Sequence, residues 1–304
     1  AGRRFLPALV AAALAMVVVG AQHVEGSGVR ITVLPVGQGD CAVFELPDGT
    51  VLMVDGGQDD RLDAGTVADV VLPFFARRGI ERIDVMVLSH PHPDHGHGLA
   101  PVARALPVGE LWLTEASGEG DGVVARLLAA IPPQTRVLTT PELLGAHRFG
   151  DTVVEVQAPA PVERTATYPE LSANDNSLVL RLCNAGTCAL WPGDIEALGE
   201  EQLLATGVDV RAAVVKAPHH GSATSSIAAF VERVGARDVI FCTGPDNQFG
   251  FPAAPVIERW RAAGAHLWDT AANGQISIFL GPDGVRMRAF RDAPVVSGTG
   301  AARR

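Results

Sequence analysis

Residues 88–98 read Leu-Ser-His-Pro-His-Pro-Asp-His-Gly-His-Gly. This stretch contains the pattern His-x-His-x-Asp-His, which is formed by His90, His92, Asp94 and His95. It follows residues 83–88, a short apolar run that is typical of a buried strand. We therefore expect the histidines on the loop that leaves the carboxyl end of a strand, where α/β sheets commonly place their chemistry.

The spacing of these residues predicts a metal site. In an extended loop, side chains two residues apart point the same way, so His90 and His92 can bind one ion. Asp94 and His95 follow a turn stiffened by Pro93 and can reach a second ion beside the first. Imidazole and carboxylate groups suit zinc, manganese or iron. A polar loop without a ligand is the weaker interpretation, because the chain has only 9 histidines and concentrates them here.

The length, composition and net charge of the chain limit the class of protein. A chain of 304 residues with 47% hydrophobic residues can form one large domain or two small ones around a large core. The formal net charge of -10 argues against binding of nucleic acid by a broadly basic surface. A nuclease could escape this objection, because bound metal ions supply local positive charge.

The 4 cysteines match neither a zinc ribbon nor a redox motif. Cys183 and Cys188 flank residues 184–187, which are expected to form a hairpin turn. They could form a disulfide in an oxidising compartment or remain two small buried residues. Cys41 and Cys242 suggest no role.

The His-x-His-x-Asp-His pattern after a buried strand resembles the metallo-β-lactamase superfamily. Further segments resemble one branch of it, the C-terminal domain of ComEC-type DNA-internalisation competence proteins, and the resemblance extends from about Val29 to Phe290. These segments are Val36-Gly37-Gln38-Gly39-Asp40, Asn174-Asp175-Asn176-Ser177, Gly193-Asp194 and residues 216–222, which read Lys-Ala-Pro-His-His-Gly-Ser.

The resemblance implies an α/β fold of the metallo-β-lactamase type, a four-layer αββα sandwich with metals at the edge between two sheets. Alternating strands and helices alone would indicate only an α/β protein. The pattern predicts strands at 29–36, 41–46 and 51–54, a helix at 65–78, and a closing hairpin of strands 275–280 and 285–289.

The resemblance also implies a ligand set for two divalent ions. Asp194 would bridge both ions, and His219 would complete the second site with Asp94 and His95. Asp94 and Asp194 are accordingly the predicted catalytic residues. The superfamily's usual histidine near Asn174 is missing, so water or an amide oxygen would complete the first site. Oxygen ligands favour manganese over zinc, although zinc remains possible, and no organic cofactor is expected.

Other residues of these segments are candidate substrate contacts: Asn174, Asn176, Lys216, His220 and Ser222. Each asparagine could instead be a polar strand start, and Lys216 a solvated strand end. Asp55 could brace a metal-bound histidine or simply form a turn.

One position departs from the branch. Residues 247–252 read Asn-Gln-Phe-Gly-Phe-Pro, whereas the related pattern is Asn-x-Tyr-Gly-His-Pro. Phe251 therefore stands where an imidazole able to move a proton or bind phosphate would be expected.

Three segments are expected along the chain. Residues 1–24 are a hydrophobic segment that begins with Arg3-Arg4 and continues as an apolar run, either a signal-like sequence or the end of a transmembrane helix. Residues 25–290 form the metallo-β-lactamase-like domain, and residues 291–304 a disordered tail. The chain lacks an initiator methionine and is expected to be a fragment or a processed form.

The resemblance implies a metal-dependent DNA phosphodiesterase that acts on single-stranded DNA during natural transformation. The domain would lie outside the cytoplasm, in the periplasm at the inner membrane, after a membrane channel region. One alternative is an extracytoplasmic hydrolase of a small ester, thioester or lactone. Another is a non-catalytic, metal-stabilised docking domain of a DNA channel.

Overall fold

The computed structural model describes residues 28–58, 66–114, 122–140, 142–157, 172–245 and 247–295. The expectations for residues 1–24 and for residues 296–304 lie outside these ranges. Within them, no helix combines the length and the apolar character needed to cross a membrane. The packed chain extends to Val295, five residues past the predicted domain boundary, because Val295 is buried and its carbonyl accepts a hydrogen bond from Arg261.

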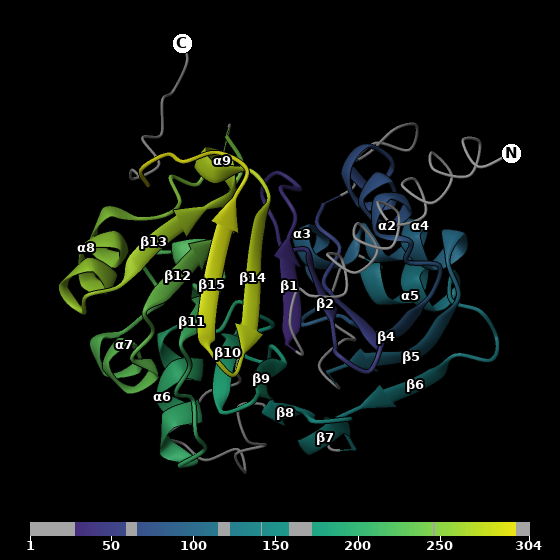
Figure 1. Cartoon of the computed structure of the whole chain (residues 1–304), viewed down its shortest axis with the longest axis horizontal. Helices are drawn as coiled ribbons and strands as arrows, with labels where there is room; N and C mark the ends of the chain where they lie inside the picture. The colour runs from purple at the N-terminus through teal and green to yellow at the C-terminus, as the bar shows by residue number, and fades with distance from the viewer. Residues whose placement is uncertain are drawn as a thin grey trace, which may run out of the picture.

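The first half of the chain and its C-terminal hairpin form one mixed sheet (Figure 1). Its order is β15 (Gly284–Ala289), β14 (Ile276–Gly281), β1 (Val29–Val33), β2 (Ala42–Glu45), β3 (Val51–Val54), β4 (Ile83–Val87), β5 (Val108–Leu113) and β6 (Arg136–Thr139). The strands from β3 to β6 pair in parallel, so their carboxyl ends meet at one edge.

The second half of the chain forms a second mixed sheet. Its order is β13 (His266–Asp269), β12 (Asp238–Phe241), β11 (Val214–Lys216), β10 (Thr187–Trp191), β9 (Val179–Asn184), β8 (Thr152–Gln157) and β7 (Gly145–Phe149). Cys183 lies directly opposite Cys188 across β9 and β10, and the two form a disulfide with Cα atoms 4.1 Å apart. Cys41 and Cys242 are buried free thiols.

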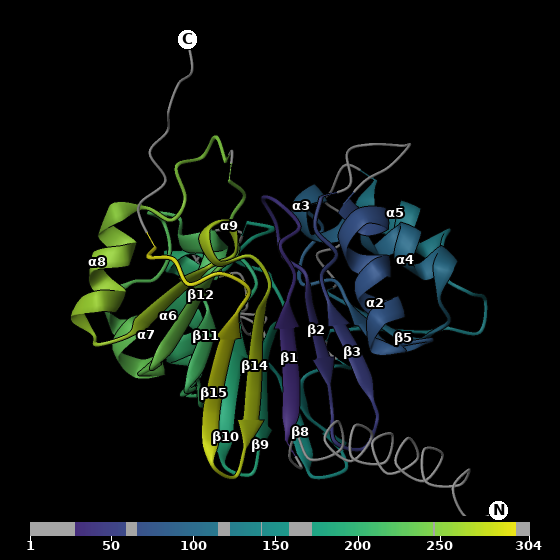
Figure 2. The ribbon, with the colours of Figure 1, turned by 45° about the horizontal axis from the view of Figure 1, so that its top comes forward.

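Alternation along the strands explains the layers. One face of each sheet supplies the apolar side chains of a central core, including Ile31, Phe44 and Trp191. The opposite face of the first sheet packs under η1 (Val67–Val71), α2 (Leu72–Arg78), α4 (Leu99–Ala105) and α5 (Val123–Leu128). The second sheet is covered by α6 (Ala197–Ala205), α7 (Ala228–Val234) and α8 (Ala254–Ala262). The two helical layers enclose both sheets (Figure 2), so the predicted αββα sandwich is confirmed.

A buried carboxylate joins two of these helices. Glu200 of α6 accepts hydrogen bonds from the backbone N–H groups of Ser226 (2.5 Å) and Ile227 (2.7 Å), just before α7. Burial raises the pKa of Glu200 to about 8, and these N–H groups only partly oppose the shift. Folding therefore takes up a proton at this site.

We expect Glu200 to make stability fall with rising pH. The folded pKa lies above the ordinary value, so the contribution is full below about pH 4.5 and is lost as pH rises towards 8. Glu200→Gln mimics the protonated acid. The free energy of unfolding of the wild type, relative to this variant, should fall by roughly 3–5 kcal/mol between pH 5 and 8. Urea unfolding across this range tests the difference. Exposed Glu201→Gln is the control, and parallel profiles for Glu200→Gln and wild type would contradict the assignment.

Candidate metal centre

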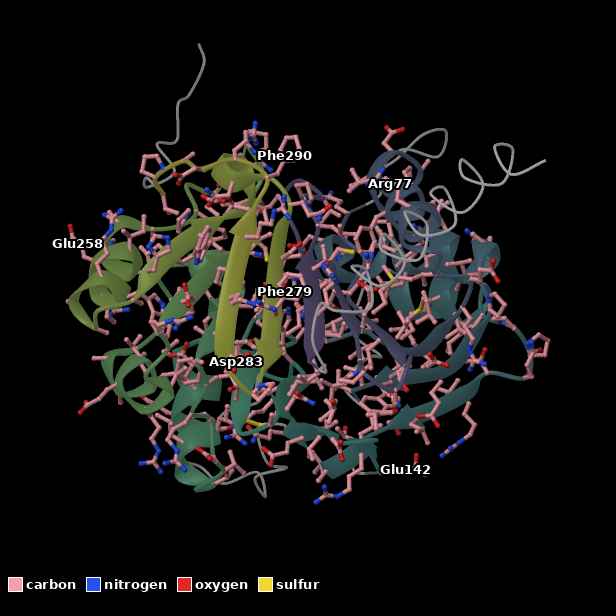
Figure 3. All side chains as sticks on the ribbon, viewed as in Figure 1. Arg77, Glu142, Glu258, Phe279, Asp283 and Phe290 are labelled. Atoms are coloured by element: carbon pink, nitrogen blue, oxygen red, sulfur yellow. A yellow bond between two sulfur atoms is a disulfide. The ribbon has the colours of Figure 1, made fainter. Side chains whose placement is uncertain are left out.

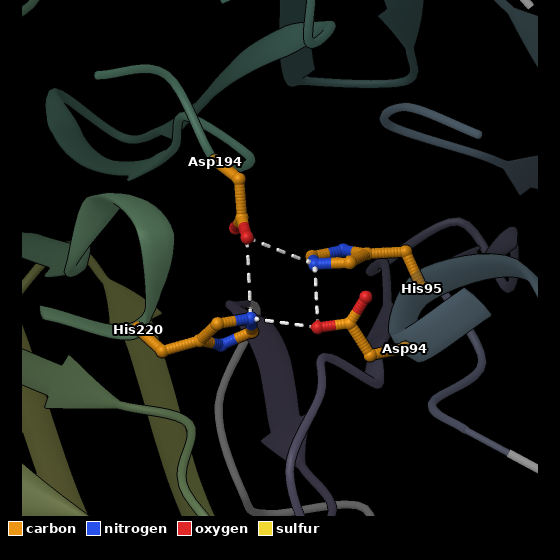
Figure 4. A group of neighbouring side chains, drawn as sticks. All are labelled: Asp94, His95, Asp194 and His220. Carbon is orange, nitrogen blue, oxygen red and sulfur yellow. Dashed lines mark ion pairs between the residues drawn. The ribbon is translucent and has the colours of Figure 1, made fainter. Parts of the chain in front are cut away.

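Side chains from both halves of the chain meet where the two sheets end. Asp94 and His95 lie on the short helix α3 (Pro93–Gly96), which follows β4 and the loop of Ser89. Asp194 follows β10, and His220 lies in the short helix η3 (Pro218–Gly221) after β11. Figure 4 shows these four side chains, which approach one another from facing sides.

The four side chains form a compact group. Oδ2 of Asp194 lies 3.2 Å from Nε2 of His95 and 3.2 Å from Nε2 of His220. Oδ2 of Asp94 lies 3.3 Å from Nε2 of His220 and 4.0 Å from Nε2 of His95. All four donor atoms lie within 4.8 Å of one another.

These distances fit a divalent ion. Ligand atoms about 2.1 Å from a metal lie roughly 3–4 Å from one another, which is the spacing of this group. Nε2 of His95 and Nε2 of His220 are buried and make no hydrogen bond. Buried nitrogens in this state are costly unless another partner satisfies them, and a metal ion would do so.

The His90–His92 pair adjoins this group. Nε2 of His90 lies 3.1 Å from Nδ1 of His92, and the His90 ring centroid lies 4.2 Å from that of His95. Burial lowers the pKa of His90 well below its ordinary value, as does the neighbouring His95. A neutral imidazole offers a free lone pair, so His90 and His92 could hold a first ion.

Charge is balanced within the centre. Burial acts to raise the pKa of Asp194, but His220 and Lys216 outweigh it and hold that pKa well below its ordinary value. Burial acts to lower the pKa of His95, yet the surrounding carboxylates, Asp194 first, raise it well above the usual value. Asp194 is thus an ionised carboxylate, the form that binds a cation.

Asp55 braces His95. Its Oδ2 lies 2.9 Å from Nδ1 of His95, and its two oxygens also accept hydrogen bonds from Ser89 N and Oγ, both at 2.8 Å. This contact turns Nε2 of His95 towards Asp94 and Asp194, the arrangement that carboxylates give to metal-bound histidines.

Lys216 occupies a different position from the one predicted. We predicted a phosphate contact, but the side chain is fully buried. Its Nζ lies 2.7 Å from Asp194 Oδ1, 2.6 Å from Asp40 Oδ2 and 2.8 Å from the Gly193 carbonyl. Lys216 therefore cannot reach a substrate in this structure, and it positions Asp194 instead.

Asp40 is a site residue that the sequence analysis missed. Besides Lys216, it contacts Nδ1 of His220 at 3.2 Å through Oδ1. Its backbone N–H donates to the Asp94 carbonyl, and a Cβ at the preceding Gly39 would collide with that carbonyl. The Val-Gly-Gln-Gly-Asp segment was the available signal, but we used it only as part of the family resemblance and assigned no role to Asp40.

The structure brings His220, rather than the predicted His219, into the four-residue group. His220, predicted to contact substrate, lies in the four-residue group. His219, predicted as a ligand of the second ion, has Nδ1 2.9 Å from Oε1 of Glu196 and Nε2 4.0 Å from Asp194 Oδ2. Both histidines have positive φ, 46° and 52°, so the chain turns sharply here and directs the two rings differently. His219 lies beside Glu196 and outside the four-residue group.

The remaining predicted contacts lie in the loops around the centre. Ser222 is buried, and its Oγ lies 2.8 Å from Oγ1 of Thr224. Asn176 donates from Nδ2 to the Ser172 carbonyl, whereas Oδ1 of Asn174 is buried without a hydrogen bond. Asn174 is therefore the better of the two asparagines to supply an amide oxygen.

Phe251 extends the centre outward. Its ring stacks on His220 with centroids 6.4 Å apart and on Phe249 with centroids 5.6 Å apart. Asn247 holds this loop, since its Oδ1 accepts from Phe251 N at 2.9 Å and its Nδ2 donates to Phe251 O at 2.7 Å. Phe249 is 59% exposed, so the stack leads from the buried His220 to solvent.

Buried imidazoles and carboxylates at the meeting edge of two helix-covered sheets define a metal-dependent hydrolase. The family model described as "Metallo-beta-lactamase superfamily" matches residues 34–244, and the chain belongs to this superfamily.

Its relatives include competence proteins. The chain is 28% identical to "Competence protein ComA" of Neisseria gonorrhoeae over 268 residues, which are 86% of this chain and 35% of the relative. It is 24% identical to "ComE operon protein 3" of Bacillus subtilis (strain 168) over 264 residues, 81% of this chain and 32% of the relative. The chain thus spans about a third of the length of these relatives. Among solved structures, a "New Diphosphatase from the PhnP Family" aligns with a TM-score of 0.48 at 15% identity, covering 79% of this chain and 94% of that one.

Proposed function

We propose that this chain is a metal-dependent DNA phosphodiesterase, the nuclease domain of a ComEC-type DNA uptake protein. The observation that carries the proposal is the pairing of two carboxylates, Asp94 and Asp194, with His95 and His220 beside a second histidine pair. In this superfamily, such a donor set suits two divalent ions, and its oxygens favour manganese over zinc.

The role in DNA uptake rests on the relatives. One is named a competence protein and another a protein of the ComE operon, and each matches most of this chain. The domain would act outside the cytoplasm, at the inner membrane, on DNA delivered by a channel region of the full protein. Single-stranded DNA is the proposed substrate.

The residues of the metal centre would have different roles in hydrolysis. When bound, two divalent ions would polarise a phosphodiester and generate a nucleophile from water at neutral pH. Asp194 would contact both ions and fix their separation, while Asp55 and Lys216 orient His95 and Asp194. His219 is partly exposed and its Nδ1 contacts Glu196, so it can carry a proton between the reaction and solvent.

We expect Phe249 to stack on a base of the bound strand. Phe249→Ala should raise the KM for single-stranded DNA about fivefold or more and leave kcat/KM for bis(p-nitrophenyl) phosphate unchanged, because only the polynucleotide has bases. Steady-state kinetics on both substrates measure this split. Leu128→Ala, which truncates an apolar side chain of 44% exposure on α5, is the control. Equal losses on both substrates would contradict base stacking.

The nuclease proposal is tested with the purified protein, loaded with manganese or zinc and incubated with end-labelled single-stranded DNA. Cleavage that requires the metal and is lost in Asp94→Ala supports it. Hydrolysis of a small ester or lactone without cleavage of DNA would replace it with another activity of the superfamily.

A further inference from the structure

One part of the first sheet lacks a helical cover among the described residues. Helices pack on β2 to β5, whereas the outer face of β15, β14 and β1 looks towards the viewer in Figure 1. Along β1, Val29, Ile31 and Val33 point into the core, so Arg30 and Thr32 point outward. Figure 3 shows Phe279 on this face and Phe290 at its upper end.

Arginines and phenylalanines are interleaved across these strands. Arg30 pairs with Phe279, and Phe279 with Arg286, in the registers of β1, β14 and β15. The guanidinium carbon of Arg30 lies 4.2 Å from the Phe279 ring centroid, and that of Arg286 lies 5.6 Å from it. The aromatic ring is thus held between two cations, an arrangement that fixes all three side chains.

The face is positively charged in an acidic protein. We define the arginine face as Arg30, Arg78, Phe279, Arg286, Arg288 and Phe290. Glu45 pairs with two of its four guanidinium groups, at 2.7 Å from Arg78 and 3.9 Å from Arg30. Burial lowers the pKa of Arg30, and so do Arg78 and Arg288 despite the opposing effect of Glu45. A bound anion would reduce this repulsion between the guanidinium groups and is therefore favoured at this surface.

The face also offers space and leads to the metal centre. A depression of about 510 Å³ is lined by Arg30, Arg78, Phe279 and Arg288, and it ends at Phe290, which is 81% exposed. At the upper end of β1 the chain continues into the loop of Asp40, whose backbone contacts Asp94. Figure 2 places α3 beside this end of β1, so the face and the metal centre share one edge of the molecule.

We propose that the arginine face is a second binding site for single-stranded DNA, which holds the strand and leads it to the metal centre. The inference rests on the proposed nuclease function, because it assigns a surface to the same substrate. A guanidinium group can donate two parallel hydrogen bonds to the oxygens of one phosphate, and an exposed phenylalanine ring can stack on an unpaired base.

Binding is measured without cleavage, by fluorescence anisotropy of a labelled oligothymidine in the presence of a chelator. Arg286→Ala with Arg288→Ala is expected to weaken binding about tenfold and to lower the salt dependence of log Kd by about 1.4, the slope for two phosphate contacts. Arg148→Ala with Arg233→Ala is the matched control, because it removes two exposed charges from β7 and α7 and should change binding less than about twofold. Thermal unfolding checks that both pairs fold.

The outcomes separate this proposal from the nuclease itself. If the wild-type protein binds single-stranded DNA through the arginine face but does not cleave it when metal is added, the binding site is retained and the nuclease function is rejected. The proposed site would be overturned if both double variants lost DNA affinity equally, or if neither lost any. If the double variant of Arg286 and Arg288 bound DNA normally but no longer bound phosphatidylglycerol vesicles, the face would be a membrane-binding surface and the DNA site would be rejected.

Discussion

Asp94→Ala is expected to lower the rate of phosphodiester hydrolysis by about a thousandfold or more while the domain remains folded. Losses of this size follow when an enzyme loses a group that acts directly on the reacting atoms. Oδ2 of Asp94 lies 3.3 Å from His220 Nε2, in the group that would hold one of the two ions. The variant should therefore bind fewer metal ions, which elemental analysis measures beside the rate.

The fold should survive this substitution because Asp94 is partly exposed. Burial acts to raise the pKa of Asp94, but His95 and His220 hold it below its ordinary value. The variant loses these favourable contacts, but both histidines keep Asp194 as a partner. Asp151→Ala, in the exposed turn between β7 and β8, is the control of equal chemistry and should keep full activity. If Asp94→Ala retained a tenth of the wild-type rate with both ions bound, Asp94 would not belong to the catalytic group.

The sequence predicted the local parts of this centre. His90, His92, Asp94 and His95 lie on one short loop, and the apolar run before them is β4. Local spacing was enough here, because a strand end and a proline-stiffened turn fix where these side chains point. Their arrangement around an ion stays a prediction until a metal is measured.

The parts that depend on distant contacts could not be predicted. His219 and His220 are adjacent and identical in type, and only the positive φ of both residues decides which ring enters the four-residue group. Asp40 lies far from Asp94 in the sequence, and the contact between their loops exists only once β1, β2 and β4 pair within one sheet.

Lys216 shows why a residue type can mislead. A lysine at a strand end usually extends its amine to water, so a solvated or phosphate-binding group was the natural expectation. Here two buried carboxylates compensate for its loss of hydration, which no local pattern reports. The strand β7 was not predicted, because it is a largely exposed edge strand and its apolar pattern is weak.

Lys216→Ala is expected to destabilise the metal-free protein by about 3–5 kcal/mol, because it leaves Asp40 and Asp194 buried without their shared cation. Urea unfolding in the presence of a chelator measures this loss. Arg211→Ala is the control, since it removes an exposed ion pair with Asp209 and should leave the free energy of unfolding nearly unchanged.

Metal should partly reverse the effect of Lys216→Ala. A divalent ion next to Asp194 replaces the lost positive charge, so manganese or zinc should stabilise the variant more than the wild type. The same charge balance predicts that the variant binds metal at least as tightly but hydrolyses its substrate more slowly, because Asp194 is no longer oriented by Lys216. Equal stabilisation of both proteins by metal would mean that the ion lies too far from Asp194 to replace the lysine, and Asp194 would then not be the shared ligand.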